Sequence, residues 1–225
     1  MTIIICLWGS ILMPLELDAV NYVDEIAKAK KENNLEKLGL LLAGRNSTYF
    51  NNGQIDSVLK HAPEDMETLR EIEDWNRYYE TWTYLVNTYI YYTNSKNKAL
   101  REVEAMYADA KERNNQNGLA IAYYTMGNVY LGMNNLDESA NAYKKGLDIM
   151  LQMEKPMGVI SEVFSYYGDV LNEQKRYKEL DELTVKWKTA LERLIGENLQ
   201  MTKDQLEILW VYYDIACVQA ATGLG

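Results

Sequence analysis

Few motifs in this sequence have the residue types and spacing that catalysis or metal binding needs. It contains one histidine, His61, and two cysteines, Cys6 and Cys217, which have neither disulfide nor metal-ligand spacing. His61 has no second histidine and no cysteine three or four residues later, so we expect an ordinary, partly exposed helical residue. The sequence also has no glycine-rich phosphate loop, paired histidines or serine nucleophile elbow. We therefore predict a binding protein and not an enzyme, with no cofactor and no metal.

Polar residues that suit ligand binding recur at a fixed spacing. Asn87, Asn128 and Asp169 are 41 residues apart. Short amide and carboxylate side chains placed in this way can hold the backbone of an extended peptide. Equal spacing also predicts that each residue sits on an equivalent structural element, as in a repeat protein.

The clearest repeat unit covers residues 120–151, with the sequence AIAYYTMGNVYLGMNNLDESANAYKKGLDIML. Gly127 has no side chain and lets two antiparallel helices approach closely, while aromatic rings fill the space around the crossing. The same order of residue types recurs around Gly168, Val86 and Asn46, at offsets of 41, 41 and 40 residues, and again near Ala216. The chain therefore contains a series of related helix hairpins.

This unit closely resembles a tetratricopeptide repeat. The residues that carry the resemblance are Tyr123, Met126-Gly127, Tyr130, the turn Asn134-Asn135-Leu136, Tyr143 and Gly146-Leu147. The resemblance implies an all-α fold, a right-handed α-solenoid of antiparallel helix hairpins. A period near 40 exceeds the roughly 34 residues of the standard repeat. The longer unit is similar to the repeats in sensor regions of bacterial histidine kinases.

We expect a leading helix over residues 15–32, four hairpins, and a closing helix over residues 202–222. Paired asparagines, Asn33-Asn34 and Asn114-Asn115, mark the ends of helices. Pro63 lies within the second helix of the first hairpin and predicts a kink or a restart there. The rings expected to pack in the core are those of Tyr89, Tyr123, Tyr130, Tyr143 and Tyr177.

In stacked hairpins the first helices line the concave surface, so ligand-binding side chains should lie on those helices, opposite the packing positions. The residues at such positions are Thr83, Asn87, Ile90, Tyr91, Tyr124, Asn128, Leu131, Glu162, Ser165, Asp169 and Asn172. Of these, we predict ligand contacts for Asn87, Tyr91, Tyr124, Asn128, Asp169 and Asn172. The alternative is that asparagine and aspartate merely solvate an open groove.

The net charge of the chain limits the kinds of partner that it is expected to bind. Acidic residues outnumber basic ones by 33 to 23, giving a net charge of -10 without a basic cluster, which argues against nucleic acid. Asn87 and Asn128 resemble the asparagines of the carboxylate clamp in chaperone-binding tetratricopeptide domains. However, Thr83 and Tyr124, one turn earlier, are not basic. We expect a neutral or basic protein or peptide ligand.

The ends of the chain suggest its context. Residues 1–15 include the apolar run IIICLWGSILMPL, which is too short to span a bilayer as a helix and is typical of a signal-peptide remnant. An apolar capping segment is the alternative. We expect residues 16–225 to form the repeat domain and, because the sequence stops where another helix would follow, we expect this domain to be truncated at its C-terminus. We expect no membrane contact by the repeat domain itself and a periplasmic or membrane-tethered location outside the cytoplasm, with a cytoplasmic location as the alternative.

These features favour the sensory or interaction region of a bacterial signal-transduction protein of the histidine kinase type. The alternatives are a free-standing scaffold that assembles other proteins and the ligand-sensing half of a peptide-regulated transcription factor. The flanking gene sequence distinguishes the three. A membrane helix followed by a kinase region supports the first, a stop codon supports the scaffold, and a helix-turn-helix supports the transcription factor.

Overall fold

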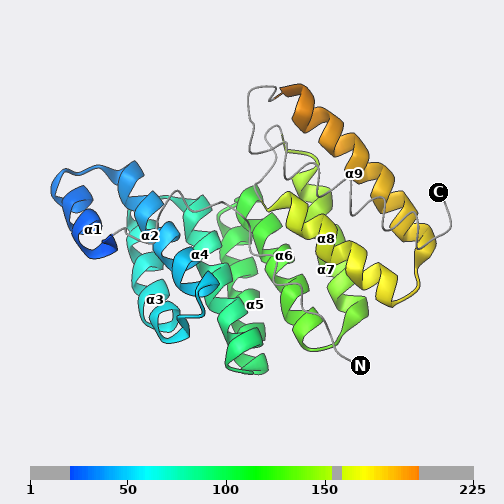
Figure 1. The fold of residues 1–225 in the computed structure, drawn as a ribbon, viewed down its shortest axis with the longest axis horizontal. Coiled ribbons are helices and arrows are strands. Elements are labelled where there is room, and N and C mark those ends of the chain that lie inside the picture. The colour runs from blue at the N-terminus through cyan, green and yellow to red at the C-terminus, as the bar shows by residue number, and fades with distance from the viewer. Residues whose placement is uncertain (1–20, 154–158, 198–225) are drawn as a thin grey trace. The chain divides into compact units, whose positions relative to one another are not determined.

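The computed structural model describes residues 21–153 and 159–197, which form helices joined by short connections (Figure 1). The described residues contain no strand, so the all-α prediction is confirmed for them. The predicted leader, residues 1–15, and the predicted closing helix, residues 202–222, lie outside them. The helices are α1 Tyr22–Lys31, α2 Leu35–Asn51, α3 Ile55–Glu71, α4 Trp75–Asn87, the π-helix η2 Thr88–Tyr92, α5 Lys96–Glu112, α6 Gln116–Gly132, α7 Leu136–Met150, α8 Ile160–Glu173 and α9 Tyr177–Glu197.

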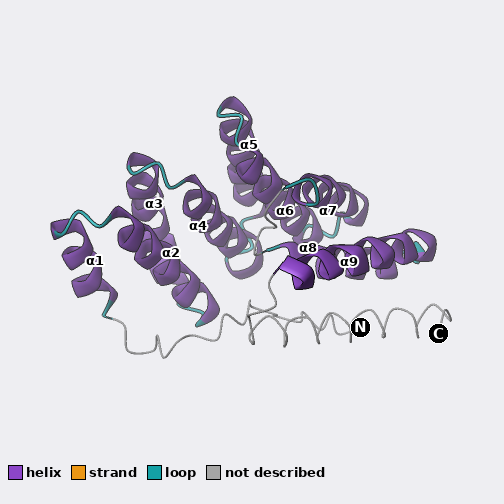
Figure 2. Cartoon of the chain, turned by 90° about the horizontal axis from the view of Figure 1, so that it is seen from above, coloured by secondary structure: helices purple, strands orange, loops and turns teal. Residues whose placement is uncertain are grey.

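Short loops join the helices (teal in Figure 2). Several of them are a three-residue turn whose central residue has a positive φ angle. A left-handed residue lets the chain reverse after a helix, and asparagine tolerates this conformation better than most residues. The central residues are Asn33, Gly53, Glu73, Asn114, Asn134 and Lys175. In several turns the next residue caps the following helix, as when Asn34 accepts a hydrogen bond from the Lys37 backbone N–H at 3.0 Å. The helix ends predicted at the paired asparagines are therefore confirmed.

The chain divides into two compact units, residues 1–95 and 96–225. In unit 1, α2 packs on α1, α3 and α4. In unit 2, α6 packs on α5 and α7, and α8 packs on α7 and α9. The two helices predicted to form the second hairpin, α4 and α5, belong to different units.

Unit 1 departs from the predicted layout at two helix boundaries. Helix α1 begins at Tyr22, later than the predicted residue 15, because the Asn21 side chain caps it by accepting the Asp24 backbone N–H. Helix α3 runs from Ile55 to Glu71 with Pro63 inside it, so the predicted restart of the helix is wrong. Pro63 is exposed, so its ring lies outside the core. The helix continues through it although proline has no backbone N–H to donate.

The crossing of α6 and α7 in unit 2 shows the packing expected from the repeat. Gly127 faces the Tyr143 ring so closely that a Cβ atom built on the glycine would lie 2.4 Å from two ring carbons. Ser139 donates a hydrogen bond to the Gly127 carbonyl at 2.9 Å, which adds a polar link at the same crossing. The glycine and the tyrosine are thus matched in size.

The five tyrosines predicted to be core residues have different environments. Tyr89 and Tyr143 are buried, as predicted. Tyr123 and Tyr130 are only half-buried. Tyr177 is 44% exposed, so its prediction is wrong, because it occupies the first position of α9, where its ring can extend into solvent beyond the helix packing.

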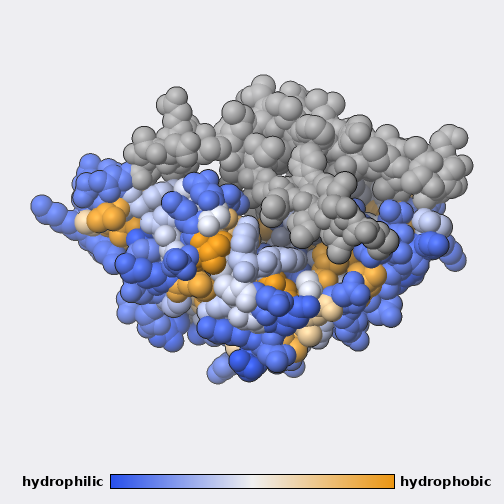
Figure 3. Space-filling view, turned by 60° about the horizontal axis from the view of Figure 1, so that its bottom comes forward, coloured by the Kyte–Doolittle hydropathy of each residue, from blue (hydrophilic) through white to orange (hydrophobic). Residues whose placement is uncertain are grey.

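The described surface is mostly hydrophilic on the face shown in Figure 3, with separate hydrophobic patches between hydrophilic residues. Among the residues that the structure describes, none of the helices is both long and apolar enough to span a membrane.

Candidate ligand-binding site

Helix α8 carries a polar stripe. Glu162, Ser165, Asp169 and Asn172 recur at steps of three and four residues and therefore share one helical face. Ser165, Asp169 and Asn172 are exposed and Glu162 is half-buried. The opposite side of α8 is apolar and packs into the core of unit 2. The structure thus presents the α8 members of the predicted site to solvent.

Two of the predicted groove residues, Tyr124 and Glu162, are in contact at the N-terminal end of this stripe. The Tyr124 hydroxyl of α6 donates a hydrogen bond to Oε2 of Glu162 on α8 at 2.7 Å. A hydrogen bond to a charged acceptor is stronger than one between neutral groups. Tyr124 is only 5% exposed, so it serves as an internal support for the carboxylate, and the expectation that its ring lies open to a groove needs correction.

Asn128 also lies inside unit 2. It is 2% exposed, and its Oδ1 accepts a hydrogen bond from the Tyr143 hydroxyl at 2.7 Å. The physical reason is that α6 is covered on two sides, by α5 and by α7. The helix face expected to line the groove is therefore part of the core, and Asn128 connects α6 to α7.

Three tyrosine rings surround this connection. Tyr166 of α8 stacks on Tyr124 with centroids 6.4 Å apart and on Tyr143 with centroids 6.2 Å apart. Tyr124 and Tyr143 are buried, whereas Tyr166 is half-buried and forms the solvent-facing side of the group. Spacings of this size are typical of offset aromatic pairs. The rings hold the polar groups in a rigid apolar frame.

Burial raises the pKa of the Tyr124 hydroxyl well above its ordinary value, and the negative charge of Glu162 adds to the effect. A hydrogen bond with the Asn128 side chain acts in the opposite direction. Tyr124 is therefore protonated at neutral pH and remains a donor to Glu162. The hydroxyl orients the carboxylate without neutralising it.

The remaining predicted residues belong to unit 1. Asn87 is buried and Tyr91 is 42% exposed. Tyr91 lies in η2, where the Thr93 backbone N–H bonds to the Thr88 carbonyl five residues earlier at 3.1 Å. Steps of three and four residues describe an α-helix and do not hold through such a turn. The structure gives Tyr91 a solvent-facing position and Asn87 an internal one.

We define the α6–α8 site by Tyr124, Glu162, Tyr166, Asp169 and Asn172. Tyr166 was missed in the prediction, although it lies four residues after Glu162 and so on the same side of the helix. Its aromatic type at that spacing was the available signal. The arrangement offers carboxylates, an amide and an aromatic ring on one helix face, which suits recognition of a peptide with cationic or neutral side chains.

Within the described ranges, 21–153 and 159–197, no group of three or more histidine, cysteine, aspartate or glutamate side chains could hold a metal ion. Comparison with known protein families gives no match, and a search of curated proteins gives none either. The case for function therefore rests on the site itself.

Proposed function

We propose that this chain is a helical-repeat protein that binds an extended protein or peptide segment, neutral or basic, at the α6–α8 site. The observation that carries the proposal is the half-buried Glu162 carboxylate, which the Tyr124 hydroxyl fixes on α8, one turn before the half-buried Tyr166. A preoriented carboxylate loses little freedom when a ligand binds.

The charges near the site favour a cationic side chain in the ligand. Glu162 and Asp169 lie two helical turns apart on α8, and the whole chain carries a net charge of -10. A lysine or arginine that approaches Glu162 also meets an aromatic ring, and a cation over such a ring contributes about 0.5–1 kcal/mol at an exposed site. An acidic ligand would meet repulsion at both carboxylates.

The architecture we propose is a right-handed, tetratricopeptide-like solenoid with long repeats. The support is the sequence signature at 41-residue spacing together with antiparallel helix packing and repeated turns inside each unit. We propose that the biological role is that of a sensory or interaction region in a bacterial signal-transduction protein of the histidine kinase type, in the periplasm or tethered to a membrane outside the cytoplasm.

A positional-scanning peptide library tests the proposal. Immobilised decapeptides with lysine, arginine, alanine or glutamate at one position at a time would be probed with the full chain. We expect peptides with a basic residue to be retained and acidic ones to be rejected. We expect Glu162→Gln to weaken binding of the selected peptide roughly tenfold, since a hydrogen bond to a charged group contributes about 1.5–3 kcal/mol and the neutral bond that glutamine can keep contributes about 0.5–1.5 kcal/mol.

Glu104→Gln is the matched control, because Glu104 is an exposed glutamate on α5 and its loss changes the net charge equally. It should bind as the unchanged chain does. Circular dichroism of both variants verifies that helicity is kept. Equal affinity of Glu162→Gln and Glu104→Gln for the selected peptide, or selection of acidic peptides, would contradict the proposal.

A further inference from the structure

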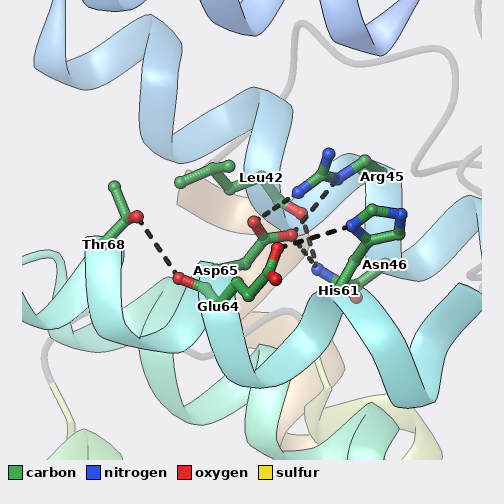
Figure 4. Close-up of polar contacts among 7 residues, drawn as sticks. All are labelled: Leu42, Arg45, Asn46, His61, Glu64, Asp65 and Thr68. Carbon is green, nitrogen blue, oxygen red and sulfur yellow. Dashed lines mark hydrogen bonds and ion pairs between the residues drawn. The ribbon is translucent and has the colours of Figure 1, made fainter.

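The single histidine of the chain lies beside a buried polar cluster that joins α2 to α3 (Figure 4). The cluster consists of Arg45, Asn46 and Asp65, all buried. Arg45 forms two hydrogen bonds to the Asp65 carboxylate, through Nε and Nη2. The Asn46 amide donates to Oδ2 of Asp65 at 2.7 Å and to the Leu42 carbonyl at 3.0 Å. One carboxylate thus accepts three donors and balances one cation.

His61 lies one turn before Asp65 on α3. Its ring contacts Tyr49 of α2, with centroids 5.7 Å apart. Its Nδ1 atom is buried and has no hydrogen-bond partner among the described residues. The carboxylate of Glu64 lies 3.8 Å from that atom, beyond hydrogen-bond distance, and the Glu64 side chain is 71% exposed. The His61 ring thus lies next to charged side chains, but its Nδ1 atom makes no hydrogen bond with a described residue.

We propose that the α2–α3 hairpin is an acid-sensitive element, in which protonation of His61 weakens the packing of α3 on α2. Protonation places a second cation next to Arg45. Asp65 already accepts three donors, so it offers poor compensation, and the exposed Glu64 is screened by solvent. The new Nδ1–H donor would also be buried without an acceptor in hydrogen-bond range.

The charged and titratable groups that act on His61 come from both helices. Arg45 and Tyr49 lie on α2, and Lys60, Glu64 and Asp65 lie on α3. None of the charges that act on the imidazole comes from a described residue of α4. Burial lowers the pKa of His61 most, Arg45 and Lys60 lower it further, and Asp65 and Glu64 partly oppose them.

The direction of the effect follows from this lowered pKa. A histidine that binds a proton more weakly when folded stabilises the folded chain fully above the unfolded pKa of about 6.5, and this stability is lost as the pH falls below it. Asp65 has the opposite sign, because burial raises the pKa of its carboxyl and protonation then favours the folded state. That effect begins where the pH falls to the raised pKa of Asp65 and is complete at the ordinary carboxyl value near 4.

NMR titration of the imidazole signals in the full chain is the first test, because the chain has one histidine and the signals need no assignment. We expect a midpoint below about 6.5. The second test is hydrogen exchange of α2 and α3 amides between pH 7.5 and 5.5, corrected for intrinsic rates. Between pH 7.5 and 5.5 the equilibrium constant for opening should rise more in the unchanged chain than in His61→Gln. The difference is at most about tenfold, which applies if His61 stays neutral in the folded chain over the whole range.

The double variant Lys60→His/His61→Gln is the matched control, because it keeps one histidine but moves it to an exposed neighbouring position on α3. It should behave like His61→Gln. The proposal is overturned if the His61 midpoint lies at or above 6.5, or if His61→Gln keeps the full pH dependence of the unchanged chain. If His61→Gln does not fold, the NMR midpoint of the unchanged chain decides alone.

Discussion

The close contact between Gly127 and Tyr143 predicts that Gly127→Ala destabilises unit 2. The added Cβ atom would lie 2.4 Å from two carbons of the Tyr143 ring. The ring cannot move aside easily, because it is completely buried and its hydroxyl is held by Asn128 at 2.7 Å. Overpacking of this kind costs about 1–3 kcal/mol or more, and the higher helix propensity of alanine returns only about 1 kcal/mol. A 2.4 Å contact places the cost in the upper part of that range, so we expect a net loss of about 1–2 kcal/mol.

Gly168→Ala is the matched control. Gly168 occupies the equivalent position one repeat later, but its added Cβ atom would lie 3.6 Å from Leu180 and 3.9 Å from Leu183, at ordinary contact distance. Without a clash, only the helix propensity remains, and the variant should gain about 0.5–1 kcal/mol. The same substitution at equivalent positions should therefore change stability in opposite directions.

Urea unfolding of the full chain, followed by circular dichroism, measures both changes, and hydrogen exchange of α6 and α7 amides assigns them to unit 2. The urea concentration at the unfolding midpoint should fall for Gly127→Ala and rise for Gly168→Ala, and the m-value should stay the same in both. If Gly127→Ala is as stable as the unchanged chain, or if both variants lose stability equally, the reasoning from size matching is refuted.

Two further predictions concern single polar groups. The Thr81 hydroxyl is buried without a hydrogen-bond partner among the described residues, so Thr81→Val should raise the free energy of unfolding by about 1 kcal/mol in a urea titration; a loss of stability would contradict this. Burial raises the pKa of Tyr123 to about 12 and that of Tyr124 well above its ordinary value. The two protonated phenols therefore stabilise unit 2 fully below pH 10, and this stability is lost as the pH rises from about 10 through the raised pKa values. Tyrosinate absorbance with circular dichroism should show α-helix loss above pH 10 that is reduced in Tyr124→Phe, and an equal loss in both chains would disprove the assignment.

Local features of the fold could be predicted from the sequence because they depend on neighbouring residues. The turn at Asn134 and Asn135 needs a left-handed residue followed by a cap, and both requirements are met by two adjacent side chains. The restart expected at Pro63 did not occur, because tertiary packing keeps α3 continuous through a residue that disfavours helices.

The candidate site could be predicted only in part. Asp169 and Asn172 lie on a helix with one exposed face, where periodicity is a sufficient guide. Tyr124 and Asn128 lie on α6, which is covered on two sides, so periodicity alone could not distinguish a groove position from a core position. The environment of His61 was also missed, because Arg45 lies 20 residues from Asp65 in sequence and only the folded hairpin brings them together.

The most direct test of the proposed binding role is to map a bound peptide by hydrogen exchange of the full chain. The lysine- or arginine-containing decapeptide selected from the library would be added at saturation. We predict added protection along α8 near Glu162 and Asp169. With the peptide lowered to a concentration near its Kd for the unchanged chain, Glu162→Gln should show much weaker protection than the unchanged chain. Protection confined to helices outside the α6–α8 site, or protection that is unchanged in Glu162→Gln, would contradict the account.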